Sequence, residues 1–215
     1  MNRFLALLIS ILSAAIILIH CSAEKTVVRN PEERCELPVW NAGDYWKYQL
    51  SDKRWWSDKV IGVGKDIYIV ESGNERKAID SKTLRFKMWV DIQWKRVPSR
   101  SGEGSLFYDF PLYVGKKWGK MVEGQLFSGA AVDYLFSFRV LSFEEVKVAA
   151  GTFKAFKIQV EQKSLQSGGV ATTHIWFSPE IKNLVKLEFI DSYGAWSVKR
   201  QDFELADYRL AVNYK

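Results

Sequence analysis

Apolar and polar residues alternate with a period of two along most of the chain beyond Trp40. In Phe153–Gln162, for example, Ile158 and Val160 alternate with Gln159 and Glu161. This alternation is typical of antiparallel strands that bury one face and expose the other to solvent. The clearest examples lie in the last third of the chain.

The same pattern, interrupted by turn-forming residues, predicts a succession of strands. We expect strands or extended segments at Tyr45–Leu50, Lys59–Val63, Asp66–Glu71, Lys77–Ile79, Leu84–Val90, Ile92–Val97, Leu106–Phe110, Lys117–Gln125, Ala131–Ser142, Glu145–Val148, Phe153–Gln162, Val170–Phe177, Leu184–Ile190 and Trp196–Tyr208. No window of helical length beyond the first 23 residues shows a capped apolar stripe. The sequence therefore predicts one all-β domain, an antiparallel meander curled into a barrel, a half-barrel or a sandwich.

Two short segments of the chain resemble each other. Gly43-Asp44-Tyr45-Trp46 and Gly115-Lys116-Lys117-Trp118 both read G-x-x-W, and each follows a proline closely. A glycine in a turn that starts a strand, with a tryptophan three residues later in the core, explains the pattern. It indicates two similar sub-sheets, with chance similarity in an aromatic-rich chain as the alternative.

The first 23 residues have the features of an export signal. Arg3 precedes an apolar run from Phe4 to Ile19, and small residues follow as far as Ala23. The run is short for a membrane span, which needs about 20 apolar residues. We therefore expect export, with the chain in the periplasm or anchored at the cell envelope.

The signal can end in three ways. Cys21-Ser22-Ala23 fits cleavage after Ala23. Leu18-Ile19-His20-Cys21 resembles a bacterial lipobox, which implies that Cys21 is a lipid attachment site, although His20 stands where that pattern has Gly, Ala or Ser. The third possibility is an uncleaved signal anchor.

The rest of the chain divides into a tether and a domain. Glu24–Pro38 is polar, charged and turn-prone, so we expect it to link the signal or anchor to a domain at residues 39–215. Cys35 is then a lone thiol, which we interpret as an inert cysteine near the start of the domain rather than a redox group.

Charge and aromatic content narrow the range of partners. The chain has 31 Lys and Arg against 25 Asp and Glu, which attracts it to anionic partners such as a membrane surface or an acidic wall polymer. Export argues against nucleic acid. All nine Trp and all nine Tyr lie beyond Ala23, where they fill a β core or line a binding surface.

The sequence lacks the residues that several classes of active site require. Beyond the signal, His174 is the only histidine and Cys35 the only cysteine, so no His or Cys/His metal site is expected, and no cofactor. His174 alternates with Ile175 and Phe177, which places it on the polar side of a strand, and no nucleophile-elbow sequence accompanies it. Carboxylates are plentiful, but nothing in their spacing nominates a glycosidase pair.

Two motifs carry a resemblance to known proteins. Residues 146–158, V-K-V-A-A-G-T-F-K-A-F-K-I, and residues 174–186, H-I-W-F-S-P-E-I-K-N-L-V-K, resemble paired motifs of uncharacterised exported bacterial β-rich families, with Ala149 in place of a proline. The resemblance implies a curved antiparallel sheet. More distantly, the chain is similar to half-barrels of the LolA/LolB lipoprotein-carrier type, which hold acyl chains on an aromatic-lined concave face.

These observations lead to three hypotheses of function. The first is a non-enzymatic envelope protein whose curved sheet binds a lipid, an acyl chain, another amphipathic ligand or an envelope partner, with Trp46, Trp118 and Trp176 as expected ligand-binding residues. The second is a carbohydrate- or cell-wall-binding module with exposed aromatic residues. The third is a glycosidase-type hydrolase with an unidentified carboxylate pair.

Overall fold

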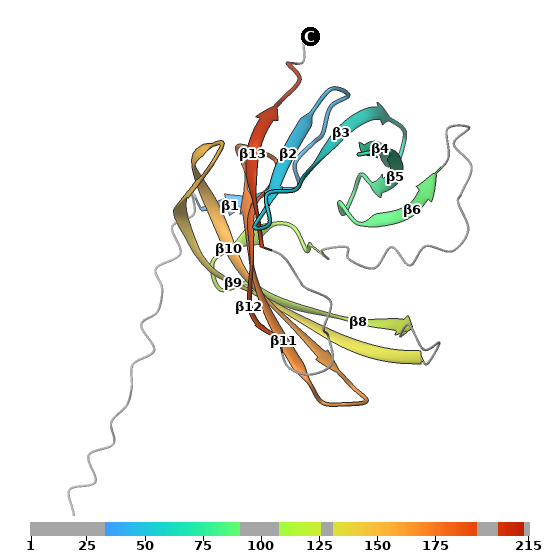
Figure 1. Ribbon diagram of the computed structural model, residues 1–215, viewed down its shortest axis with the longest axis vertical. Helices are drawn as coiled ribbons and strands as arrows, with labels where there is room; N and C mark the ends of the chain where they lie inside the picture. Colours follow the sequence, from blue (N-terminus) through green and yellow to red (C-terminus); the bar gives the residue numbers. More distant parts are fainter. Residues whose placement is uncertain (1–32, 91–107, 126–130, 193–201, 213–215) are drawn as a thin grey trace, which may run out of the picture. The chain divides into compact units, whose positions relative to one another are not determined.

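A computed structural model describes residues 33–90, 108–125, 131–192 and 202–212 (Figure 1). By internal contacts the chain divides into two units, Met1–Asn30 and Pro31–Lys215, and every described residue belongs to the second. The expected signal with Cys21, the expected strand Ile92–Val97 and the start of Trp196–Tyr208 lie outside these ranges. The described residues contain no helix, and therefore none long and apolar enough to cross a membrane.

The described residues form strands joined by short turns. The strands are β1 (Arg34–Cys35), β2 (Tyr45–Leu50), β3 (Trp55–Val63), β4 (Ile67–Ser72), β5 (Glu75–Asp80), β6 (Phe86–Val90), β7 (Leu112–Tyr113), β8 (Lys117–Gln125), β9 (Ala131–Val148), β10 (Gly151–Ser164), β11 (Val170–Ser178), β12 (Asn183–Ser192) and β13 (Phe203–Arg209). The expected strands Tyr45–Leu50 and Lys117–Gln125 match β2 and β8 at both ends.

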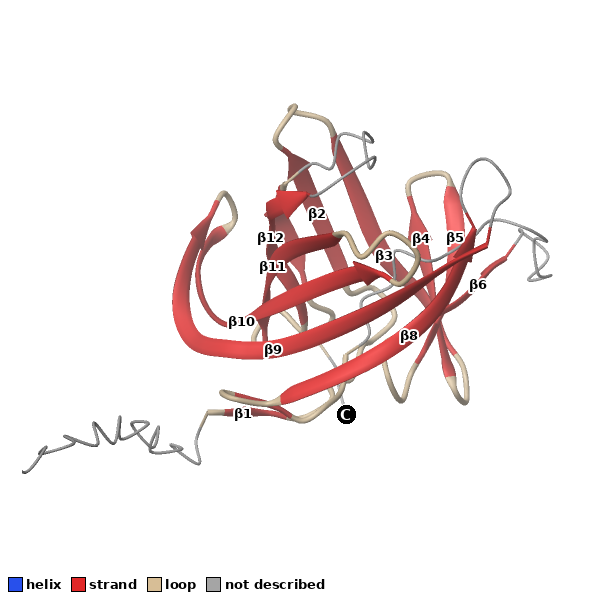
Figure 2. Ribbon diagram, turned by 90° about the horizontal axis from the view of Figure 1, so that it is seen from below, coloured by secondary structure: helices blue, strands red, loops and turns tan. Residues whose placement is uncertain are grey.

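Eleven of these strands form one antiparallel sheet in the order β6-β5-β4-β3-β2-β13-β12-β11-β10-β9-β8. Two meanders, β2 to β6 and β8 to β13, thus join where β13 pairs with β2. Within the described residues β6 and β8 are the two edges, so the sheet is open and not a closed barrel. Figure 2 shows β9 and β10 bending strongly along their length, as expected for a curled sheet. The predicted all-β meander is confirmed.

One face of this sheet carries the core, and we call it the inner face. Buried side chains from both meanders belong to a single apolar cluster, which includes Val60 and Tyr68 from the first and Phe156, Ile175 and Leu205 from the second. The alternate residues of the same strands form the outer face, which carries many polar side chains and also a smaller apolar cluster of Ile69, Ala78 and Val90 on β4, β5 and β6. Burial of this apolar area stabilises the fold by about 25 cal/mol per Å².

The two G-x-x-W segments adopt the same turn. Gly43 has φ 100° and Gly115 has φ 88°, and each occupies the third position of a turn. The next residue closes the turn, with Asp44 N–H donating to Asn41 O at 3.0 Å and Lys116 N–H donating to the matching carbonyl of Tyr113 at 3.1 Å. A positive φ at this position is the signature of a type II turn, which glycine adopts without strain.

The strands that follow these turns are also equivalent. Gly43 N–H donates to Val60 O and Val60 N–H to Asp44 O, both at 2.8 Å, while Gly115 and Lys116 make the same two bonds with Val140 at 2.9 Å. One extra residue, Ile61 in β3 and Leu141 in β9, follows each valine as a β-bulge. The two G-x-x-W segments thus begin equivalent strand pairs, β2 with β3 and β8 with β9.

The Leu141 bulge also explains an error in the expected strands. We expect Ala131–Ser142 and Glu145–Val148 as two strands, but they form the single strand β9. A bulge shifts the alternation of faces by one residue, so the period-two pattern breaks although the strand continues.

The end of the expected tether takes part in the fold. Arg34–Cys35 forms β1, which pairs with β7, and the Cys35 side chain is buried. Burial, with a smaller contribution from the charge of Glu36, raises the pKa of the Cys35 thiol to about 12. This agrees with a structural rather than a reactive cysteine.

Candidate functional site

The sheet is weakest where β12 meets β13. Only Lys186 with Glu204 and Leu187 with Phe203 are paired there, whereas β10 and β11 form eight residue pairs. Leu187 pairs with the first residue of β13, so β12 runs on past this point without a strand partner from β13. There the Asp202 carboxylate accepts a hydrogen bond from the Phe189 N–H at 2.8 Å, so that a side chain replaces a backbone partner. We call this place, where β12 continues past the start of β13, the fork.

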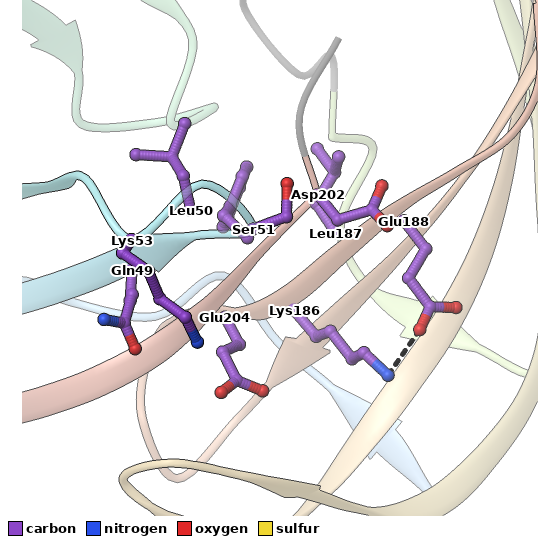
Figure 3. A pocket seen from close by; sticks show the side chains of 10 residues that line it. Gln49, Leu50, Ser51, Lys53, Lys186, Leu187, Glu188, Asp202 and Glu204 are labelled. Atoms are coloured by element: carbon purple, nitrogen blue, oxygen red, sulfur yellow. Dashed lines mark ion pairs between the residues drawn. The ribbon is translucent and has the colours of Figure 1, made fainter.

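A groove of about 230 Å³ lies at the fork (Figure 3). It is lined by residues of β2, the turn after β2, β12 and β13: Gln49, Leu50, Ser51, Lys53, Lys186, Leu187, Glu188, Asp202, Phe203 and Glu204. We call it the fork groove.

The fork groove has two chemically different sides. Gln49, Glu204 and Lys186 are cross-strand neighbours on the outer face, and Figure 3 shows their side chains pointing to the same side. Leu50, Phe203 and Leu187 form the next row of neighbours and point to the opposite side of the sheet, as the alternation of strand residues requires. The groove therefore offers polar groups on one side and an apolar wall on the other.

Charges of both signs line the groove. The Lys186 amine lies 2.5 Å from a Glu188 carboxylate oxygen, in a half-exposed ion pair. Lys53, in the turn after β2, and Glu204, on β13, form no ion pair with the described residues. Asp202 forms no ion pair with the described residues either, but one of its oxygens accepts the Phe189 N–H, so Lys53 and Glu204 are the charged side chains of the groove without a partner among the described residues.

The apolar wall continues into the interior through an aromatic trio. The Phe203 ring meets Trp56 edge-on at 4.8 Å between centroids and Tyr48 at 5.4 Å, and Tyr48 stacks on Trp56 at 4.9 Å. The Tyr48 hydroxyl donates to Leu184 O at 3.1 Å. Burial, helped by the nearby Asp58 charge, raises the pKa of Tyr48 well above its usual value, so the hydroxyl remains a donor.

An ion pair lies on the inner face beyond the trio. Lys77 donates to Asp58 Oδ2 at 2.8 Å, and both side chains are mostly buried. The other oxygen, Asp58 Oδ1, is buried without a hydrogen-bond partner. A polar group in such surroundings is costly unless it is paired, so water or another polar group is the natural partner for Oδ1.

Trp46, the first expected ligand-binding residue, lies in the core. Its side chain is 0% exposed, and its indole N–H donates to Ile181 O at 2.9 Å. Trp40 and Tyr48 donate similarly to the carbonyls of Lys182 and Leu184. These three donors hold the turn after the W-F-S-P-E motif, which gives that motif a structural role.

Trp118, the second expected residue, lies on the inner face of the edge strand β8. Its ring is parallel to that of Phe138, with 5.0 Å between centroids and 2° between planes, and the Lys116 amine lies 5.8 Å from it. The side chain is only partly buried, so an aromatic surface is accessible there.

Trp176, the third, lies on the outer face and is only 4% exposed. Lys157 and Lys186, its cross-strand neighbours, place their amines 5.0 and 5.2 Å from its ring. Its indole N–H donates to Glu144 Oε1 at 2.9 Å. The structure therefore does not bring the three tryptophans together, although Lys186 connects Trp176 to the rim of the fork groove.

Two titratable groups beside Trp176 have shifted pKa values. Burial alone would raise the pKa of Glu144, but hydrogen bonds from Ser142 and Trp176 and the charge of Lys157 outweigh it and lower the pKa. Burial and Lys157 lower the pKa of His174, which stays neutral more readily than a free imidazole.

The buried carboxylate of Asp44 has a structural role. Asp44, 0% exposed, accepts from the N–H groups of Asn41 and Ala211 and lies 3.7 Å from the Lys182 amine. No group of three or more His, Cys, Asp or Glu in the described ranges is placed to hold a metal ion.

The fork groove itself was not expected from the sequence. Lys186 and Glu188 read simply as outward positions of a strand, and nothing in the local pattern shows that β13 pairs with β2 or that it leaves β12 after two residue pairs. Such a site depends on long-range strand pairing, which has no local signal.

Comparison with known proteins gives only distant likenesses. No family model and no curated protein matches the chain. Among solved structures, it is similar to the hypothetical lipoprotein YmcC of Escherichia coli, with 11% identity, TM-score 0.46, and 80% of this chain and 90% of that chain covered. A predicted lipoprotein of Parabacteroides distasonis has 14% identity and TM-score 0.44, with 81% and 99% covered. A predicted exported protein of Bacteroides fragilis, described as having a YmcC-like fold, has 12% identity and TM-score 0.41, also with 81% and 99% covered.

Proposed function

We propose that this chain is an exported envelope protein without catalytic activity that binds an amphipathic ligand in the fork groove. The observation that carries the proposal is the two-sided lining of the groove. Lys53, Gln49 and Glu204 offer a polar rim with two charged groups, while Leu50, Leu187 and Phe203 offer an apolar wall. The apolar run at Phe4–Ile19 supports export.

An amphipathic molecule fits both sides of this lining. Its polar group stays in the wet outer part of the groove, while its apolar part contacts the wall that leads to Tyr48 and Trp56. Small-molecule sites commonly combine an apolar lining with a few fixed polar groups in this way. The groove lies at the end of the β12–β13 pairing, where β12 continues past the start of β13, so it is already open in the sheet.

Native mass spectrometry of the mature protein tests the proposal. We expect a one-to-one complex with a lauroyl lysophospholipid offered below its micelle concentration. Leu50→Gln, which places a polar group in the wall, should weaken that complex about tenfold, because polar burial without a partner costs roughly 1–3 kcal/mol. Val63→Gln, at an exposed position of β3, is the matched control and should change nothing. Absence of any complex, or equal weakening by both variants, would contradict the proposal.

One observation favours a second candidate, a carbohydrate-binding module. Trp55 is 63% exposed on the outer face and lies directly opposite Gln49, at the rim of the fork groove. An exposed tryptophan beside amide and carboxylate groups suits stacking on a sugar ring. Trp55→Ala separates the two candidates, since it should abolish binding of an N-acetylglucosamine oligosaccharide and leave amphiphile binding intact.

A further inference from the structure

Resting on the proposed function, we infer that the fork groove recognises a zwitterionic head group in which a primary ammonium and a phosphate lie a few ångströms apart, as in phosphoethanolamine. The inference comes from the charges that the groove leaves available. It specifies the chemical class of the polar part of the ligand.

Lys53 and Glu204 are the charged side chains of the groove that have neither an ion pair nor a side-chain hydrogen bond among the described residues. Lys186 is bound by Glu188 at 2.5 Å, and one oxygen of Asp202 accepts from the Phe189 N–H. Lys53 and Glu204 have no such partner among the described residues, and Figure 3 shows both side chains pointing toward the outer side of the groove. A head group with a single charge would leave one of these two unmatched.

The ammonium end has defined partners. Glu204 lies directly opposite Gln49 in the β13–β2 ladder and opposite Lys186 in the β12–β13 ladder. The Glu204 carboxylate and the Gln49 amide oxygen therefore lie side by side as two acceptors for a primary ammonium with three N–H donors. A quaternary ammonium has no N–H group and forfeits both hydrogen bonds.

The phosphate end is matched by Lys53. This residue has φ 72° in the tight turn between β2 and β3, where the Lys53 N–H donates to Leu50 O at 3.0 Å. The turn returns the chain over the end of β2, so the amine of Lys53 is brought to the groove next to Gln49. The other groove carboxylates, Glu188 and Asp202, disfavour a head group that is only anionic.

Isothermal titration calorimetry of the mature protein with three lauroyl lysophospholipids tests the inference. We expect the ethanolamine lipid to bind at least about tenfold more tightly than the glycerol and choline lipids, since hydrogen bonds to a charged group contribute roughly 1.5–3 kcal/mol. Equal binding of all three lipids would overturn the inference and leave the proposed function standing. Binding of none would overturn both.

Variants that each remove one charge show which residue causes the preference for the ethanolamine lipid. Glu204→Gln should remove the preference for ethanolamine over choline, and Lys53→Gln should weaken all three phospholipids by a similar factor. Glu145→Gln and Lys59→Gln, at exposed positions of β9 and β3, are the matched controls. Loss of the preference in a control but not in Glu204→Gln would overturn the assignment.

A competition experiment distinguishes a lipid head group from a free metabolite as the ligand. Free phosphoethanolamine in millimolar excess should compete with the ethanolamine lipid if the head group supplies most of the recognition, which supports the inference for either source. A failure to compete, combined with equal binding of the three lipids, would mean that the apolar wall alone selects the ligand and would overturn it.

Discussion

The indole N–H of Trp46 donates a hydrogen bond to the carbonyl of Ile181 at 2.9 Å, across 135 residues of sequence. Trp46 starts the first meander and Ile181 lies in the turn between β11 and β12 of the second. The contact therefore joins the two halves of the sheet inside the core. It also holds β12 in position where β12 runs on toward the fork groove.

Trp46→Phe should destabilise the protein by about 2–3 kcal/mol. The change leaves the Ile181 carbonyl without its donor and opens a small cavity, and each effect is costly in a buried place. Urea unfolding followed by circular dichroism measures the loss. Trp55→Phe, at an exposed position, is the control and should stay within about 0.5 kcal/mol of the parent. Equal stability of the two variants would show that the contact contributes little.

The paired turns give a prediction about glycine. Gly115→Ala should cost about 1–2 kcal/mol from backbone strain alone, because φ is 88° and an added Cβ meets nothing within 4 Å. Gly43→Ala should cost a similar amount, with an added contact of 3.4 Å to Ala211 Cβ. The free energy of unfolding of each variant tests this. A neutral Gly115→Ala would contradict the type II turn assigned to that segment.

The environment of Trp176 predicts loss of stability in acid, in two steps. The folded pKa of His174 lies below the ordinary histidine value of 6.5, so the unfolded chain binds the proton first, and stability falls as the pH drops below about 6.5. The folded pKa of Glu144 is also lowered, below the ordinary glutamate value of 4.5, so a second loss accompanies its protonation at lower pH. Thermal melting between pH 7 and pH 3 measures both steps.

Two variants show which residue causes each of the two losses of stability in acid. His174→Gln should flatten the melting temperature between pH 6.5 and pH 5, and Glu144→Gln should reduce the loss at lower pH. If His174→Gln retains the whole of the first step, another group causes it and the explanation is wrong.

The buried thiol gives a chemical prediction. With its pKa raised to about 12, Cys35 should resist alkylation by iodoacetamide at pH 8 in the folded protein and react fully after denaturation. Peptide mapping by mass spectrometry measures the alkylation of Cys35 separately from any other cysteine. Rapid labelling of the native protein would mean that β1 separates readily from β7.

The sequence predicted the architecture well because strand alternation is a local signal. β2 and β8 match their expected bounds, and the two G-x-x-W segments form equivalent turns at the starts of these strands. Errors arose where a local feature disguised the pattern, as the bulge at Leu141 did for β9. Nothing in the residues around Arg34–Cys35 indicated that they would pair with β7, since such pairing depends on distant chain segments.

The candidate site was harder to predict than the fold. The sequence nominated three tryptophans by residue type and position in a strand: Trp46, Trp118 and Trp176. They lie on β2, β8 and β11 and do not share one surface. Which face a tryptophan occupies, and what covers it, depends on bulges and on neighbouring strands. The residues of the fork groove are ordinary in sequence and gain their proposed role only because β12 continues past the start of β13.

Photo-crosslinking tests the central claim most directly. The mature protein would be irradiated with a lysophosphatidylethanolamine that carries a diazirine in its acyl chain, digested, and mapped by mass spectrometry. We predict crosslinks concentrated at Leu50–Lys53, Lys186–Glu188 and Asp202–Glu204, which surround the fork groove. Crosslinks that avoid these three segments and gather elsewhere, for example around Trp118 and Phe138, would contradict the proposed site.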